Sequence, residues 1–383
     1  MTNIKKIIPI ANQIIQEYDL CDQCLGRLFS KQLNLSSNKL LGKKLKMNFN
    51  QLTSKCYICK NLFENLAPYV ESMVHASHNY DFVSIVVGAM IRPSILDRDD
   101  YIRSKFKLRG RDSVKTDITK ELGKQFTKKT KKSIDFLNPD LTFTIDFKNG
   151  ICDLRSKSII LQGRYTKSKR GLPQKQKPCV NCFGKGCRNC NFHGISEYDS
   201  IEGKISQFLF NKFGGTTAKF TWIGGEDQSS LVVGSGRPFF VKIQNPLKRN
   251  ISLPRKIALD YVSIHDCKII FESPKSQLKF TSSIEIKILT ENEINSSKLK
   301  KLNEIVNIPV VVYDSFGKRS EKIISQLKYK KTGKNCFILF IKAEGGLPVK
   351  RFVESSDVTP GISQILNDKC RCIQFDFLDI VLK

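Results

Sequence analysis

The sequence has no long hydrophobic run. No stretch reaches the ~18 consecutive apolar residues that a membrane-spanning helix needs, and the longest candidate, FVSIVVGAMI at 82–91, is typical of a buried strand. The N-terminus has no secretory pattern, because IIPIANQII is short and continues into polar and acidic residues without a small-residue cleavage site. We therefore expect a cytoplasmic protein that does not contact membranes.

Acidic residues are scarce relative to basic ones. The chain has 36 Asp and Glu against 64 Lys and Arg, which gives a formal net charge of +28. Such an excess attracts polyanions over long range and favours a nucleic-acid partner. A solvated, lysine-rich surface produces the same composition, so charge alone leaves both interpretations open.

Sequence repeats and low-complexity tracts are also lacking, apart from recurring C-x-x-C pairs. At 383 residues the chain is long enough for two or three domains. Segments of helical and strand periodicity predict an α+β protein in four parts: a helical region at 1–79, an α/β unit at 80–175, a cysteine-rich linker at 176–195, and a strand-rich domain with a mixed or antiparallel sheet at 196–383. The basic stretch GRYTKSKRGLPQKQKP, which ends the second part, is interpreted as a linker or an RNA-facing loop.

Eight of the 13 cysteines form four C-x-x-C pairs. In a reducing compartment this spacing indicates metal rather than disulfides, because two such turns supply the four thiolates of a tetrahedral zinc site. The compact set is Cys179, Cys182, Cys187 and Cys190, and the set with a longer loop is Cys21, Cys24, Cys56 and Cys59. We expect one or two structural zinc ions, with no coordination position left open for a substrate.

The stretch TWIGGEDQSSLVVGSGRPF at 221–239 places Asp227 between two predicted glycine-rich turns, Gly224-Gly225 and Gly234-Ser235-Gly236. A carboxylate in such a loop can act as a nucleophile, a general base or a metal ligand. By composition alone, a solvated turn is the more common meaning of Gly-Gly-Glu-Asp.

Several motifs that follow one another in a specific order favour a functional role for Asp227 over a solvated turn. The segments YDLCDQCLGRLF, CYIC, GRYTKSKRGLPQ, C-x-x-C-x-G-x-G-C-x-x-C, GGED and GSGRPF resemble the THUMP-domain tRNA pseudouridine synthases of archaea and eukaryotes. The resemblance implies an N-terminal zinc-containing THUMP module that binds tRNA, followed by a catalytic domain that isomerises T-loop uridines 54 and 55 without an organic cofactor. It also implies that Asp227 is the catalytic aspartate and that the protein is a monomer without an obligate protein partner.

The chain departs from the family pattern near the expected chemistry. Gly225 and Leu231 stand where the family has arginines, Ser229 where it has an aspartate, and Pro348 in GLPVKRFV where it has an aromatic residue. A second family tyrosine falls near Ile284. Two hypotheses therefore remain: an active synthase supported by other basic residues such as Arg237 or Lys350, or a catalytically weak or inactive relative that still binds tRNA.

The predicted RNA contacts come from basic residues in the matched motifs. We expect Arg164, Lys167 and Arg170 of GRYTKSKR to bind phosphates, and Arg237 and Lys350 to contact the substrate near Asp227. A third reading, a zinc-stabilised nucleic-acid-binding protein unrelated to modification, explains the charge and the cysteines but not the ordered motifs.

Overall fold

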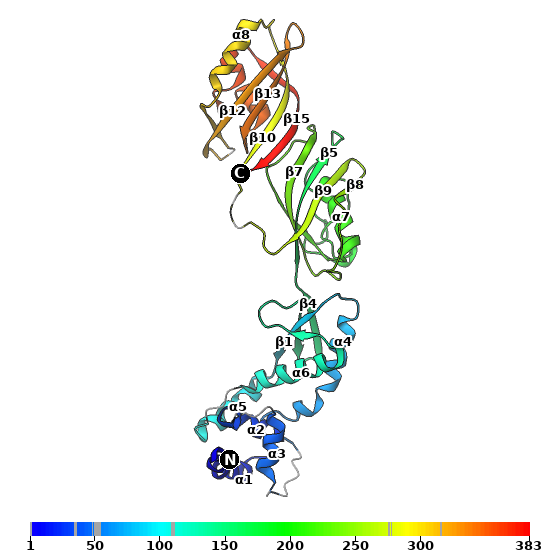
Figure 1. Cartoon of the computed structure of the whole chain (residues 1–383), viewed down its shortest axis with the longest axis vertical. Coiled ribbons are helices and arrows are strands. Elements are labelled where there is room, and N and C mark those ends of the chain that lie inside the picture. Colours follow the sequence, from blue (N-terminus) through cyan, green and yellow to red (C-terminus); the bar gives the residue numbers. More distant parts are fainter. Residues whose placement is uncertain are drawn as a thin grey trace. The chain divides into compact units, whose positions relative to one another are not determined.

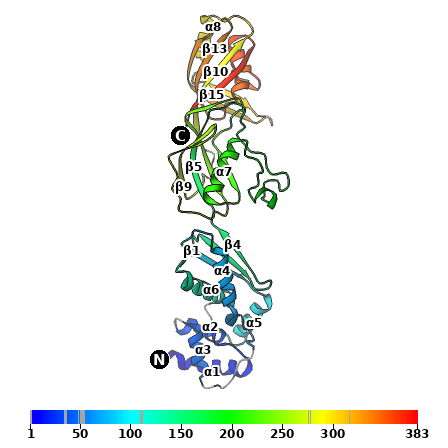
Figure 2. The ribbon, with the colours of Figure 1, turned by 90° about the vertical axis from the view of Figure 1, so that its right-hand side faces the viewer.

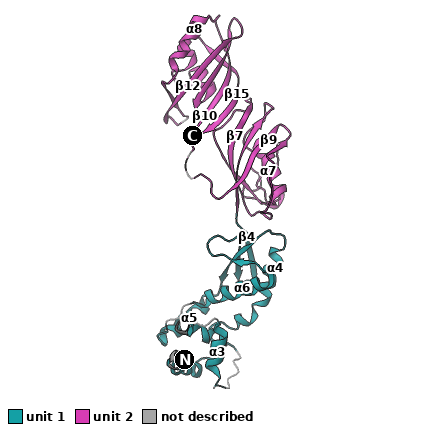
Figure 3. Ribbon diagram, viewed as in Figure 1, with its two compact units in different colours: residues 1–157 teal, residues 158–383 magenta. Residues whose placement is uncertain are grey.

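The chain divides into two compact units, residues 1–157 and 158–383 (Figure 3). The computed structural model describes residues 2–33, 37–47, 49, 55–108, 112–274, 276, 278–314 and 316–383. None of the helices in these described ranges is long and apolar enough to cross a membrane.

The first unit begins with helices and continues into an α/β layer (Figure 1). Its helices are α1 (Thr2–Glu17), α2 (Asp22–Leu33), α3 (Asn38–Lys46), η1 (Leu62–Asn65), α4 (Ala67–Ser77), α5 (Pro93–Lys105) and α6 (Val114–Thr130). Its strands are β1 (Ser84–Met90), β2 (Ser133–Ile134), β3 (Leu141–Asp146) and β4 (Ile151–Ser156), in the order β2-β1-β3-β4. Strand β1 runs parallel to β2 and β3, and β4 closes the sheet antiparallel to β3.

Val114, Ile118, Leu122 and Phe126 recur every four residues, a spacing that predicts a helix over 114–130 with one apolar face, and this face lies against the sheet. Ile118, Leu122 and Phe126 of α6 are fully buried, and Phe126 packs on Phe143 of β3 with ring centroids 5.2 Å apart. Ser113 begins α6 by accepting a hydrogen bond from the Thr116 backbone N–H. The predicted strand at 82–91 and helix at 114–130 are confirmed.

The second unit is built on one large sheet. Its strands are β5 (Ile159–Lys167), β6 (Ala218–Trp222), β7 (Val232–Ile243), β8 (Lys256–Leu259), β9 (Val262–Ile270), β10 (Phe280–Thr290), β11 (Pro309–Tyr313), β12 (Arg319–Lys331), β13 (Cys336–Glu344), β14 (Val358–Thr359) and β15 (Cys370–Leu382). The order is β14-β11-β12-β13-β10-β15-β7-β5-β9-β8, and β6 also pairs with β7. All these pairings are antiparallel except that of β15 with β7, so the expected mixed sheet is confirmed.

Helices cover the apolar side chains of this sheet. Ile201, Ile205 and Leu209 of α7 (Ile201–Phe213) share the core with strands β5, β7 and β9 (Figure 2). The remaining helices are η2 (Arg188–Cys190), α8 (Ser296–Lys300), η3 (Lys301–Ile305), α9 (Val349–Glu354) and α10 (Ile362–Leu366). Phe352 of α9 is fully buried in the same core.

Three expectations from the sequence are corrected. The chain divides at 157/158 and not at 175/176, because β5 pairs with β7 and β9 inside the second unit. Residues 164–167 are therefore part of a strand and not a linker or loop. Gly234 and Gly236 do not form a turn: both have positive φ within the continuous strand β7, which kinks there against β5.

Candidate active site

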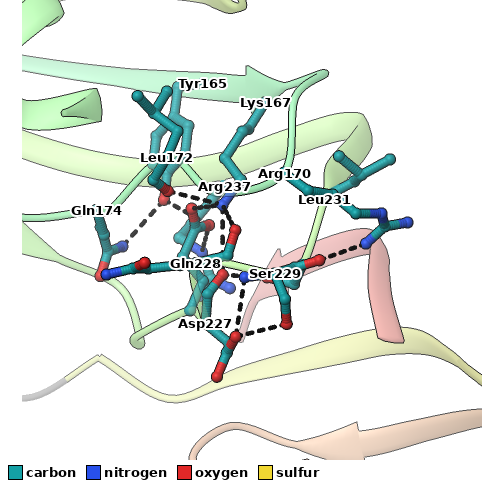
Figure 4. Close-up of polar contacts among 12 residues, drawn as sticks. Tyr165, Lys167, Arg170, Leu172, Gln174, Asp227, Gln228, Ser229, Leu231 and Arg237 are labelled. Atoms are coloured by element: carbon teal, nitrogen blue, oxygen red, sulfur yellow. Dashed lines mark hydrogen bonds and ion pairs between the residues drawn. The ribbon is translucent and has the colours of Figure 1, made fainter. Parts of the chain in front are cut away.

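Asp227 lies in the loop that connects β6 to β7. Its Oδ1 accepts hydrogen bonds from the Ser229 backbone N–H at 2.9 Å and from the Ser229 hydroxyl at 2.6 Å (Figure 4). Its Oδ2 accepts a hydrogen bond from Lys350 Nζ at 2.8 Å. The carboxylate is thus fixed by three donors, while 34% of the side chain is exposed.

These donors keep Asp227 ionised. Partial burial acts to raise the pKa of the carboxyl group, but the hydrogen bonds from Lys350 and Ser229 outweigh it and lower the pKa to about 2. The same contact raises the pKa of Lys350. The pair therefore carries one full negative and one full positive charge at neutral pH.

A buried carboxylate lies directly before Asp227. Glu226 accepts a hydrogen bond from the Tyr165 hydroxyl at 2.9 Å, and it forms ion pairs with Lys167 at 3.3 Å and Arg237 at 3.4 Å. The side chains of Glu226 and Lys167 are 0% exposed, and that of Arg237 is 1% exposed. Burial and the Glu226 charge raise the pKa of Tyr165 well above its usual range, so the phenol stays protonated and donates.

Lys167 connects this cluster to the loop that carries Asp227. Its ammonium group donates to three backbone carbonyls, of Asp227 at 3.3 Å, Gln228 at 3.1 Å and Leu172 at 3.0 Å (Figure 4). Burial lowers the pKa of Lys167, and Glu226 opposes that shift. Lys167 therefore holds the loop from the protein interior. Because its side chain is fully buried, its ammonium group cannot reach a phosphate in solvent.

Arg237 is also a supporting residue. Its Nη1 donates to the Ile223 carbonyl oxygen at 2.9 Å, and its guanidinium lies 4.4 Å from the centroid of the Phe377 ring. The expectation that Arg237 contacts the substrate is corrected, since its side chain is enclosed by the protein.

Arg164 and Arg170 are likewise engaged within the protein. The Arg170 guanidinium makes a bidentate pair with Asp376, at 2.6 Å for each bond, and Asp376 in turn accepts the Leu231 backbone N–H at 2.8 Å. Arg164 donates to the Ser235 carbonyl at 2.6 Å and the Gly236 carbonyl at 2.8 Å. The two arginines that were predicted to bind phosphates therefore hold both ends of the 227–236 segment in place.

A pocket of about 330 Å³ opens beside Asp227, and we call it the catalytic pocket. It is lined by Gly225, Glu226, Asp227, Leu347, Pro348, Val349, Lys350, Arg351, Phe375 and Phe377. Pro348 brings no aromatic face to it, but Phe375 and Phe377 provide aromatic surface from β15. Ile284 is 3% exposed within the hydrophobic core and does not line this pocket.

One aromatic ring lies between the loop that carries Asp227 and the turn that precedes α9, the helix that carries Lys350. A Cβ atom added at Gly224 would lie 2.6 Å from Phe280 Cζ, and one added at Gly345 would lie 2.3 Å from the same ring. The Phe280 carbonyl also accepts the Gly345 backbone N–H at 2.8 Å. Phe280 thus fills the space that both glycines leave.

Both predicted cysteine sets assemble into clusters that can hold a metal ion. Four thiolates about 2.3 Å from a tetrahedral zinc lie about 3.8 Å from one another. The Sγ atoms of Cys21 and Cys59 are 3.7 Å apart, and those of Cys182 and Cys190 are 3.8 Å apart. Backbone N–H groups of Gly186 and Gly194 point at Sγ atoms of the second cluster, as they do around thiolates. The clusters therefore fit zinc in donor type and spacing.

The sequence did not single out several residues that hold the site: Tyr165, Gln174, Glu226, Phe280, Phe375, Phe377 and Asp376. Tyr165 lies within the GRYTKSKR motif, in which only the basic residues were predicted to have a function. Asp376 sits in an alternating strand pattern, where an acidic residue is typical of an exposed face. Nothing local to either residue indicates its distant partner.

The chain is similar to known proteins along its whole length. A family model described as "Pus10, C-terminal" matches residues 160–381, and one described as "Pus10 THUMP domain, archaeal" matches residues 69–146. The tRNA pseudouridine synthase Pus10 of Nitrosopumilus maritimus is 59% identical over 383 residues, which cover 100% of both chains. The protein of the same name in Cenarchaeum symbiosum is 33% identical over 366 residues, 96% of this chain and 90% of that relative.

The two family models match in the chain order expected from the sequence, a THUMP domain followed by a C-terminal synthase domain. The C-terminal model spans more than half of the chain and contains Asp227, Lys350 and the cluster around Glu226. The chain therefore belongs to the Pus10 family, whose relatives named above are tRNA pseudouridine synthases, a class of isomerases.

Proposed function

We propose that this chain isomerises uridine to pseudouridine in tRNA and that Asp227 is the nucleophile. The observation that carries the proposal is an ionised carboxylate, paired with Lys350 at 2.8 Å, at the mouth of a pocket of about 330 Å³. A pocket of this size suits one extruded nucleoside. Phe375 and Phe377 supply apolar surface for the uracil ring.

The reaction uses only groups that the site provides. Asp227 attacks C1′ of the sugar, and the bond between N1 and C1′ breaks. The freed uracil then rotates, C5 forms the new bond to C1′, and the bond between Asp227 and C1′ breaks to release the carboxylate. The hydrogen at C5 is lost and a proton is gained at N1, so atoms and charge balance without a redox partner or an organic cofactor. Lys350 keeps the carboxylate ionised and oriented before the attack.

The family resemblance supports T-loop uridines 54 and 55 of tRNA as the targets. The formal net charge of +28 supports a polyanionic substrate, which a THUMP domain binds through shape, phosphate and 2′-hydroxyl contacts. We further propose that both cysteine clusters hold zinc and that each ion stabilises its own unit.

Incubation of the purified protein with an unmodified tRNA transcript, followed by pseudouridine mapping, tests the proposal. We expect product with the wild-type chain and none with Asp227→Asn, which keeps the side-chain shape but removes the charge. Product that persists with Asp227→Asn would remove Asp227 from the mechanism.

The second candidate is a tRNA-binding relative without catalysis. Pro348 and Gly225 favour it, because the pocket has neither the aromatic residue nor the arginine that the family places there. Intact tRNA binding by the wild-type chain without any product would decide for this alternative.

A further inference from the structure

A second and larger pocket lies beside the catalytic pocket. It has a volume of about 550 Å³ and is lined by Gln174, Lys175, Glu202, Phe220, Trp222, Gly224 and Gly225. We call it the Trp222 pocket. No step of the proposed reaction uses its side chains.

Gly225 lines both pockets. A Cβ atom added at this position would meet no heavy atom within 4 Å, so the wall between the two pockets is low here. A chain of nucleotides that places one residue beside Asp227 can therefore continue over Gly225 into the Trp222 pocket.

The lining of the Trp222 pocket suits a nucleobase. Phe220 and Trp222 are half-buried and stack on each other, with centroids 4.8 Å apart, which gives the pocket an aromatic wall. Lys175 adds a positive charge at the rim, as a phosphate group requires. Gln174 is held in place by donating to the Tyr165 hydroxyl at 2.9 Å.

Glu202 adds an acidic side chain to the lining of the pocket. Burial raises the pKa of this carboxyl group, against hydrogen bonds from the Gln176 backbone N–H, at 3.4 Å, and from the Trp222 side chain. The carboxylate is thus held next to Trp222 in the lining of the pocket, where a carboxylate suits a ligand with two adjacent N–H donors. Among the four bases, guanine presents two such donors side by side, at N1 and at the 2-amino group.

We propose that the Trp222 pocket binds a guanine base of the substrate RNA, next to the uridine that enters the catalytic pocket, with Glu202 as the selecting group. This inference rests on the proposed function and deepens it, since it assigns a second base to the same site. Uracil and adenine lack the paired donors and bind this pocket more weakly.

Trp222 makes the pocket directly observable, because it is the single tryptophan of the chain. We suggest titrating full-length protein carrying Asp227→Asn, which prevents turnover, with the dinucleotides GpU and UpG while recording tryptophan fluorescence. The matched probes replace guanosine with inosine, which keeps N1–H but lacks the 2-amino group, or with adenosine.

We expect saturable quenching by one of the guanine dinucleotides, with half-saturation at about tenfold lower concentration than for the inosine or adenosine probe, the effect of one hydrogen bond to a charged group. Glu202→Gln is expected to abolish this preference. Thr221→Val is the matched control, because Thr221 lines a neighbouring pocket of about 180 Å³ that also borders Trp222 but not Glu202. It should leave the preference unchanged.

The inference would be overturned if quenching is absent or is equal for all bases. It would also be overturned if Glu202→Gln leaves the base preference unchanged, or if Thr221→Val removes the preference to the same extent. The readout does not depend on product formation. Pseudouridine formed without guanine-dependent quenching would remove the guanine site and leave the proposed function standing. A guanine preference without pseudouridine formation would support the guanine site and contradict the proposed function.

Discussion

At the scale of single residues, the ion pair between Asp227 and Lys350 sets the charge of the site. Lys350 donates at 2.8 Å and outweighs the effect of partial burial, so the pKa of Asp227 falls to about 2. This depressed pKa adds stability to the folded state above the unfolded pKa of about 4. That stability is lost as the pH falls through about 2.

The variant Lys350→Met should raise the pKa of Asp227, because it removes the principal charged donor. The acidic limb of kcat/KM for tRNA modification should move to higher pH, into a range where Asp227 of the wild-type chain is fully ionised and its rate does not depend on pH through this carboxyl group. A pH–rate profile measures the shift, and Lys350→Arg serves as the charge-preserving control. An unchanged limb in Lys350→Met would show that another group governs the ionisation.

Gly225 offers a second test at this scale. An added Cβ meets nothing within 4 Å, and Gly225 is not among the glycines with positive φ. We expect Gly225→Arg to change the free energy of unfolding by less than about 0.5 kcal/mol. We also expect it to keep tRNA modification, since its guanidinium enters the position that the family gives to arginine. A loss of rate beyond about tenfold would show that the open space is itself required.

At the scale of elements, strand β5 supports the loop that carries Asp227. Alternate residues place Tyr165 and Lys167 under Glu226, while Arg164 reaches the kink of β7. The loop thus gains its position from a strand that lies about 60 residues earlier in the chain.

The variant Glu226→Gln leaves Lys167 and Arg237 buried without a countercharge. We expect it to lower the free energy of unfolding by about 3–5 kcal/mol, as measured by denaturant titration. The double variant Glu226→Gln with Lys167→Met should lose less than the sum of the two single variants, because it removes both members of the pair. Strict additivity would contradict a direct interaction between them.

Sequence patterns predicted the strands with apolar alternation and the helix with a four-residue period, since burial of one face leaves that trace. Strand β12 carries no such pattern, because six of the 13 residues in RSEKIISQLKYKK are charged and most of the strand is exposed. Local motifs singled out Asp227, whose role stays a prediction, and the eight cysteines, which assemble into two clusters. Lys167 and Arg237 were misread as RNA contacts, because a basic residue buried against a distant carboxylate looks the same in sequence as one on the surface.

At the scale of the whole molecule, each unit has its own cysteine cluster. All four thiols of the first are buried, whereas Cys182 and Cys187 of the second are partly exposed. A chelator should therefore release metal in two phases, the faster from the second cluster. Colorimetric detection of the released ion measures this, and Cys182→Ser should remove the fast phase while the control Cys336→Ser does not. A single phase in the wild-type chain would contradict the assignment.

The division of the chain at 157/158 predicts which segments fold. Residues 158–383 should unfold cooperatively on heating, because they retain β5 between β7 and β9. Residues 176–383 lack that strand and should aggregate or melt without a transition. Circular dichroism compares the two, and a cooperative transition in the shorter segment would show that β5 is dispensable.

The Phe280 ring, lodged between Gly224 and Gly345, has a consequence for evolution. The three positions lie on separate stretches of the chain, yet neither glycine can be enlarged while the ring stays in place. Gly224 is also fixed independently of the ring, because its φ is +75° and an added Cβ atom would lie 2.9 Å from Arg237 Nη1. A lineage that exchanges the ring for a small side chain therefore becomes free to enlarge Gly345 but not Gly224. We expect Phe280 and Gly345 to covary across the family, while Gly224 stays a glycine whichever side chain replaces the ring.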